Sequence, residues 1–126
     1  MVSGTFILWI CWLFFNAASG LTLTRLEGAN DPSKIIMNSI LAASIGGITA
    51  LIIKPRLMAK ENERINMYDP TAVINGILAG LVSVTAPCNN IEPWCALIIG
   101  SLGGATYSLA CKLEHKLKID DPIEAS

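Results

Sequence analysis

Four long stretches of the chain contain no Asp, Glu, Lys, Arg or His, and the charged residues gather between and after them. The uncharged stretches are residues 1–24, 35–53, 70–91 and 93–111. An α-helix rises about 1.5 Å per residue, so roughly 20 apolar residues cross a hydrocarbon core about 30 Å thick. The pattern therefore predicts four transmembrane helices, at about residues 5–23, 35–53, 71–87 and 94–111. The third is the shortest, because only 16 residues lie between Pro70 and Pro87.

The composition supports a membrane protein. Of the 126 residues, 52% are hydrophobic and 15% are charged, and the mean hydropathy is +0.53, which is unlike a water-soluble domain of this size. No linker or low-complexity run divides the chain, so residues 1–126 are expected to pack as one all-α, multi-pass membrane unit. A net charge of −1 gives no support for a nucleic-acid partner.

The Lys and Arg residues are unevenly divided among the connections. Two lie between the first and second predicted helices, none lies between the third and fourth, and seven lie elsewhere. These seven are Lys54, Arg56, Lys60, Arg64, Lys112, Lys116 and Lys118. Because positively charged loops stay in the cytoplasm, the second connection and the C-terminal tail are predicted to be cytoplasmic. The end of the first helix that carries Ser19 would then lie at the outer surface.

The first predicted helix carries Trp12, Phe15 and Ser19 at positions i, i+3 and i+7. These offsets share one face of a helix, which we call the aromatic face. Two interpretations remain open at this point. The face could line a pathway for a small cation, which aromatic rings and a hydroxyl oxygen attract. Alternatively, the rings could fill space in a membrane helix while Ser19 bonds back to its own helix.

Other polar and small residues predict how the helices pack. Asn38 and Asn75 lie deep in apolar stretches, where an unpaired amide costs several kcal/mol, so each is expected to bond between helices or line a cavity. Asp69 and Pro70 predict the start of a helix, as N-cap and first helical residue. Small residues predict close helix contacts. The relevant glycines are Gly46, Gly47, Gly76, Gly80, Gly100 and Gly104.

The remaining reactive residues do not predict an enzyme or a cofactor site. Four cysteines occur without a CxxC pair, and the sequence allows but does not require a disulfide between Cys88 and Cys95. His115 is the one histidine and is expected to be solvated. No nucleophile–base pair, metal-ligand cluster or phosphate loop is recognisable. No cofactor is therefore expected.

Four stretches of the chain occur in a distinctive order: GTFILWICWLFFNAAS at 4–19, NGILAGLVSVTAPC at 75–88, IEPW at 91–94 and KLKIDDPIEA at 116–125. In that order they resemble the sixth and eighth membrane helices of ammonium transporters of the Amt/Mep/Rh family, the start of the ninth, and the approach to the tenth. The resemblance implies a partial ammonium-transporter fold, with ammonium or ammonia as the transported partner. It also implies a homotrimeric parent in a lipid bilayer, the plasma membrane.

The resemblance assigns a role to each residue of the aromatic face. Ser19 matches the hydroxyl that binds the incoming ion at the outer vestibule, and Phe15 matches the aromatic gate below it. Trp12 matches a tryptophan that lines the pore. These three residues are therefore the candidate substrate-binding residues.

The resemblance covers only part of the family's architecture, which has roughly eleven helices with two inverted halves. The chain resembles the first four helices of the second half, so we expect a fragment or a truncated gene product of an ammonium transporter. The alternative is a four-helix membrane subunit or degenerate paralogue that does not transport and has a structural or regulatory role.

Overall fold

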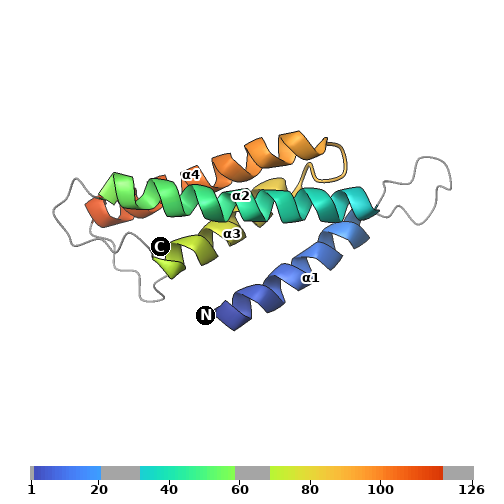
Figure 1. Cartoon of the computed structure of the whole chain (residues 1–126), viewed down its shortest axis with the longest axis horizontal. Coiled ribbons are helices and arrows are strands. Elements are labelled where there is room, and N and C mark those ends of the chain that lie inside the picture. The colour runs from blue at the N-terminus through green and yellow to red at the C-terminus, as the bar shows by residue number, and fades with distance from the viewer. Residues whose placement is uncertain (1, 21–31, 59–68, 118–126) are drawn as a thin grey trace.

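A computed structural model of the chain describes residues 2–20, 32–58 and 69–117, and these residues form four helices (Figure 1). The helices are α1 (Val2–Gly20), α2 (Pro32–Met58), α3 (Pro70–Thr85) and α4 (Pro93–Leu117). The described residues contain no strand, and the prediction of an all-α membrane fold is confirmed. The helices α1, α2 and α4 are long and apolar enough to cross a membrane, whereas α3 is an apolar helix of 16 residues.

The ends of the helices differ from the predicted ranges. The helix α1 begins at Val2, and the predicted residues 21–23 lie outside the described part of the chain. Both α2 and α4 continue past the uncharged stretches, since Lys and Arg side chains on a helix end can extend toward the membrane surface. The helix α3 ends at Thr85, because Pro87 has no backbone N–H with which to continue it.

The predicted start of α3 is confirmed. A side-chain oxygen of Asp69 accepts a hydrogen bond from the backbone N–H of Thr71 at 2.9 Å, and Pro70 is the first helical residue. Pro93 is likewise the first residue of α4, but the acceptor there is a backbone group. The backbone N–H groups of Cys95 and Ala96 donate to the carbonyl oxygen of Glu92.

Small residues bring α2, α3 and α4 into direct backbone contact, as predicted from the glycine pattern. A Cβ atom on Gly46 of α2 would lie 2.5 Å from the carbonyl oxygen of Gly76 in α3. A Cβ atom on Gly80 or Gly100 would collide with the backbone of Ala42, so Ala42 lies between α3 and α4. Such close approach provides packing contacts where lipid supplies no hydrophobic drive. We call α2, α3 and α4 the three-helix unit.

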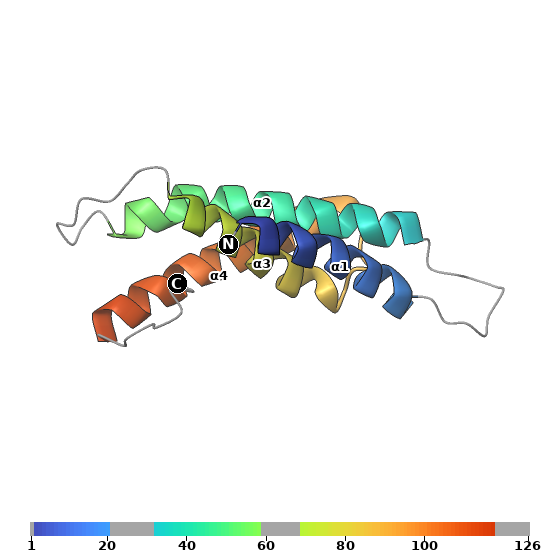
Figure 2. The ribbon, with the colours of Figure 1, turned by 90° about the horizontal axis from the view of Figure 1, so that it is seen from below.

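Successive helices run in opposite directions, and α1 lies to one side of the three-helix unit (Figure 1). The C-terminal end of α1 approaches the start of α2, and its N-terminal end lies away from α2. Within the described residues, α1 contacts α2 and α3 but not α4. At the other side of the unit, the C-terminal part of α4 separates from α2 (Figure 2).

Candidate functional site

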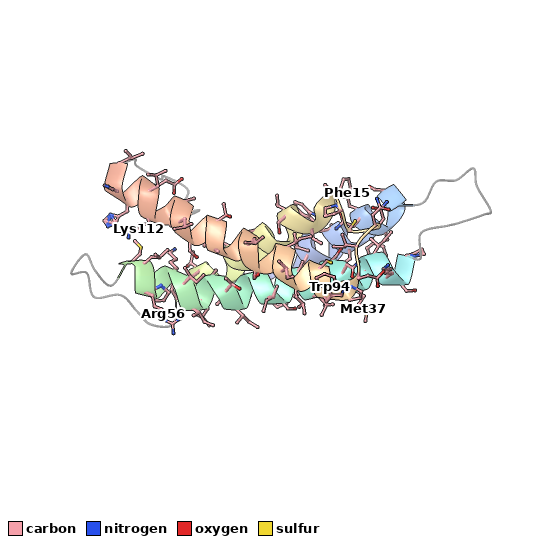
Figure 3. All side chains as sticks on the ribbon, turned by 90° about the horizontal axis from the view of Figure 1, so that it is seen from above. Phe15, Met37, Arg56, Trp94 and Lys112 are labelled. Carbon is pink, nitrogen blue, oxygen red and sulfur yellow. The ribbon has the colours of Figure 1, made fainter. Side chains whose placement is uncertain are left out.

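The aromatic face lies near the C-terminal end of α1. Phe15 and Ser19 are exposed, with the Phe15 side chain 59% exposed, and Trp12 is half-buried. Figure 3 shows Phe15 at the same end of the molecule as Trp94, whereas Arg56 and Lys112 lie at the opposite end. The two basic side chains thus share one end, as the topology predicted from the charges requires.

Trp12 connects the aromatic face to α3. Its indole N–H donates a hydrogen bond to the hydroxyl oxygen of Thr85 over 2.8 Å. The Thr85 hydroxyl in turn donates to the carbonyl oxygen of Leu81 at 2.7 Å. The N–H of Trp12 and the hydroxyl proton of Thr85 are therefore both in use. Another molecule can contact the indole ring but cannot accept a hydrogen bond from its N–H.

Ser19 bonds back to its own helix. Its hydroxyl donates to the carbonyl oxygen of Phe15 at 2.8 Å, which is the arrangement that the second interpretation of the sequence anticipated. This bond occupies the only proton of the hydroxyl and leaves its lone pairs as acceptors. An exposed acceptor beside an exposed aromatic ring suits a small cation that carries N–H donors.

Asn16 is a polar residue of this region that was not predicted from the sequence as a site residue. Its side chain is 1% exposed, and its amide nitrogen donates to the hydroxyl of Ser39 in α2 at 2.9 Å. Ser39 is fully buried and donates to the carbonyl oxygen of Ile35 at 2.9 Å. The signal was present in the sequence, because Asn16 is an amide in an uncharged stretch, four residues after Trp12.

The connection between α3 and α4 is fixed to the start of α2. The amide nitrogen of Asn38, which is fully buried, donates to the carbonyl oxygens of Cys88 at 2.9 Å and Ile91 at 3.0 Å. Asn38 was expected to bond to another helix or line a cavity, and it bonds instead to the connection between α3 and α4. Lys34 and Glu92 add an exposed ion pair with a 2.6 Å separation of nitrogen and oxygen. Burial raises the pKa of the Cys88 thiol, so this thiol stays protonated.

A second polar cluster joins the three-helix unit at the opposite end. The hydroxyl oxygen of Tyr107 in α4 accepts hydrogen bonds from Asn75 of α3 and Lys54 of α2, each at 3.2 Å. The ammonium nitrogen of Lys54 also lies 5.5 Å from the centre of the Tyr107 ring and 3.7 Å from a carboxylate oxygen of Asp69. The expected interhelical bond of Asn75 is confirmed.

The cysteines and the histidine provide no further site. Cys11, Cys88, Cys95 and Cys111 are all free, so the disulfide that the sequence allowed between Cys88 and Cys95 is absent. His115 is exposed near the end of α4. Among residues 2–20, 32–58 and 69–117, no three His, Cys, Asp or Glu side chains are grouped as metal ligands would be.

The four apolar helices, packed through small residues, define a multi-pass membrane protein. The model of the Ammonium Transporter Family matches residues 1–126, and the chain belongs to this family. The recognition from the four sequence stretches is thereby confirmed. Since this family consists of transporters, the expectation that the chain is not an enzyme agrees with it.

Individual relatives support the same assignment. The chain is 41% identical to Ammonium transporter Amt2 of Archaeoglobus fulgidus, over 98% of this chain and 24% of that protein. It is 35% identical to Ammonium transporter 3 of Dictyostelium discoideum, over 100% of this chain and 28% of that protein. The crystal structure of Saccharomyces cerevisiae Mep2 matches with a TM-score of 0.75 and 32% identity, over 98% of this chain and 26% of Mep2. The chain thus spans about a quarter of the length of these relatives.

Proposed function

We propose that this sequence forms part of an ammonium transporter and contributes the aromatic face of α1 to the transport pathway. Family membership supports ammonium as the substrate. The observation that carries the assignment to α1 is the position of Phe15 and Ser19. Both are exposed, on a helix that the three-helix unit covers on one side only.

In the proposed mechanism, ammonium meets Ser19 at the outer vestibule. The Ser19 hydroxyl donates to the Phe15 carbonyl, so it presents only acceptor lone pairs to the ion. An N–H group of ammonium then bonds to this oxygen as the ion loses water. The Phe15 ring attracts the desolvated cation by roughly 2 kcal/mol or more, and the ring closes the path as a gate.

Trp12 continues the pathway past Phe15. Its indole N–H is directed to Thr85 and away from the path, so it does not repel a cation with a positive dipole. The indole surface adds a second aromatic contact on the same face of α1. The three residues thus form a series from hydroxyl to gate to pore lining.

The assembly and the location of the protein form part of the same proposal. The lipid bilayer is the solvent for the apolar outer surfaces of α1, α2 and α4. We assign the transporter to the plasma membrane as a homotrimer, in which each copy supplies one aromatic face.

The experiment is methylammonium uptake in yeast that lacks its own ammonium transporters. Two proteins are compared after their membrane expression has been confirmed. One is the 126-residue chain, and the other is an extended version in which the chain replaces the matched quarter of yeast Mep2. The proposal predicts uptake by the extended version. Absence of uptake by both proteins would favour the alternative of a membrane subunit that does not transport.

A further inference from the structure

Within the described residues, apolar packing against α2 and α3 determines the rotation of α1 only weakly. Within the described part of this helix, just Thr5, Asn16 and Ala17 are buried. Open apolar pockets of about 230 and 290 Å³ lie between its N-terminal half and the helices α2 and α3. Large apolar side chains on α1 are exposed at intervals from Val2 to Phe15. They form no narrow apolar stripe that would select one face for the three-helix unit.

Two side-chain hydrogen bonds define the rotation of α1 about its axis, which apolar packing leaves undefined. Trp12 bonds to Thr85 of α3, and Asn16 bonds to Ser39 of α2. Residues four apart lie one above the other on a helix, so both bonds leave α1 from the same side. Because they end on two different helices, rotation of α1 in either direction would stretch one of them. Phe15 lies in the turn between the two donors.

We propose that Asn16 and Ser39 are positioning residues that, together with the bond between Trp12 and Thr85, fix the rotation of α1. The bonds thereby set the direction of the Phe15 ring and the Ser19 hydroxyl. The effect on uptake rests on the proposed function, whereas the rotation of α1 is measurable by itself.

Both acceptors are held in a fixed direction. The Ser39 hydroxyl donates to Ile35 and the Thr85 hydroxyl donates to Leu81, each on its own helix. Each hydroxyl therefore offers only its acceptor lone pairs to α1. Asn16 and Ser39 are 1% and 0% exposed, so water does not replace a lost bond between them.

The rotation is tested by ¹⁹F NMR of the full chain labelled with 5-fluorotryptophan in lipid nanodiscs. The Trp12 signal is assigned by comparison with Trp12→Phe. Ser39→Ala removes the acceptor of Asn16, whereas the indole N–H of Trp12 bonds to Thr85, and we expect the substitution to shift or broaden the Trp12 signal. Ser44→Ala is the matched control. Ser44 is exposed on the same helix, and its hydroxyl donates to the carbonyl oxygen of Ile40 within that helix. A Trp12 signal that is identical in wild type, Ser39→Ala and Ser44→Ala would overturn the proposal.

A double variant separates positioning from stability. Asn16→Leu combined with Ser39→Ala replaces both polar groups with apolar ones, which is often nearly neutral for stability. We expect thermal unfolding close to that of wild type but a Trp12 signal that stays shifted. A wild-type signal in this variant would show that contact alone, and not the directional bond, orients α1.

Uptake by the extended version completes the test. We expect Ser39→Ala and the double variant to lower methylammonium uptake about fivefold to tenfold, as for loss of one buried hydrogen bond. Ser44→Ala should leave uptake unchanged. A shifted Trp12 signal without uptake by the unmodified extended version would contradict the proposed function and leave the positioning role standing. A shifted signal with normal uptake in both Ser39 variants would overturn the link from α1 rotation to the site.

Discussion

The three-helix unit and α1 are held together by different interactions. Within α2, α3 and α4, glycine and alanine allow backbone atoms to touch, and polar clusters join the helices at both ends. The described glycine of α1 makes no such contact, since a Cβ atom on Gly4 would meet nothing within 4 Å. Two directional side-chain hydrogen bonds join α1 to α3 and α2. The comparison separates a unit joined by backbone contacts from a helix that side-chain hydrogen bonds join to it, and the proposed site lies on that helix.

The largest effect is expected from the same substitution made in the two regions. Gly46→Ala places a Cβ atom 2.5 Å from the backbone of Gly76, so we expect a loss of about 3 kcal/mol or more in the free energy of unfolding. Gly4→Ala enters open space in α1 and should stabilise the helix by about 0.5–1 kcal/mol. Thermal unfolding in detergent micelles measures both. Equal shifts in the two variants would contradict the comparison.

A smaller loss is expected at the connection between α3 and α4. Asn38→Ala removes the donor for two backbone carbonyl groups, those of Cys88 and Ile91. We expect a loss of about 2 kcal/mol in unfolding free energy, because these carbonyls would be left without their partner. Asn90→Ala, at an exposed position of the same connection, is the control and should change stability by less than about 0.5 kcal/mol. The prediction is wrong if the two variants have the same free energy of unfolding.

A substitution at Ser19 on α1 should weaken the binding of the transported ion and leave the unfolding temperature of the chain unchanged. Ser19→Leu removes the acceptor oxygen, and we expect the methylammonium concentration for half-maximal uptake by the extended version to rise about tenfold. Ser19→Thr keeps the hydroxyl and should retain the wild-type value. Since Ser19 is exposed, the unfolding temperature of the chain should stay constant in both variants. An unchanged half-maximal concentration in Ser19→Leu would remove Ser19 from the site.

The smallest effect is expected at the exposed ion pair. Lys34 and Glu92 have side chains that are 34% and 63% exposed, so solvent and salt screen their attraction. Lys34→Ala should cost about 0.5 kcal/mol or less at low salt and nothing measurable at high salt. Chemical unfolding at two salt concentrations tests this. A loss of unfolding free energy as large as that of Asn38→Ala would show that the ion pair contributes strongly to the stability of the α3–α4 connection.

Much of the three-helix unit could be predicted from local patterns. The uncharged stretches predicted the helices, and Asp69 predicted the start of α3. The spacing of Gly76 and Gly80 predicted a face for close helix packing. Asn75 was expected to bond across helices because an unpaired amide in an apolar setting is costly, and it bonds to Tyr107 of α4. These predictions succeed because each depends on a residue and its neighbours in sequence.

The partners of the polar side chains could not be predicted in this way. Thr85 and Ser39 are each bonded to their own helix and look like ordinary helix residues in the sequence. Their second role, as acceptors for Trp12 and Asn16, depends on where α1 lies in space. The distances of 73 and 23 residues along the chain carry no local signal for these pairs. The positions of Phe15 and Ser19 on a face that the other helices leave exposed likewise required the structure.

The most direct test compares two neighbouring phenylalanines of α1. Phe15 and Phe14 are 59% and 69% exposed, so replacing either by alanine should leave the stability of the chain nearly constant. The measurement is methylammonium uptake by the extended version with Phe15→Ala or Phe14→Ala at equal membrane expression. We predict that Phe15→Ala changes uptake by about tenfold or more, as for loss of a desolvated cation–π contact and of the gate, and that Phe14→Ala does not. Equal uptake by the two variants would contradict the assignment of the pathway to the aromatic face.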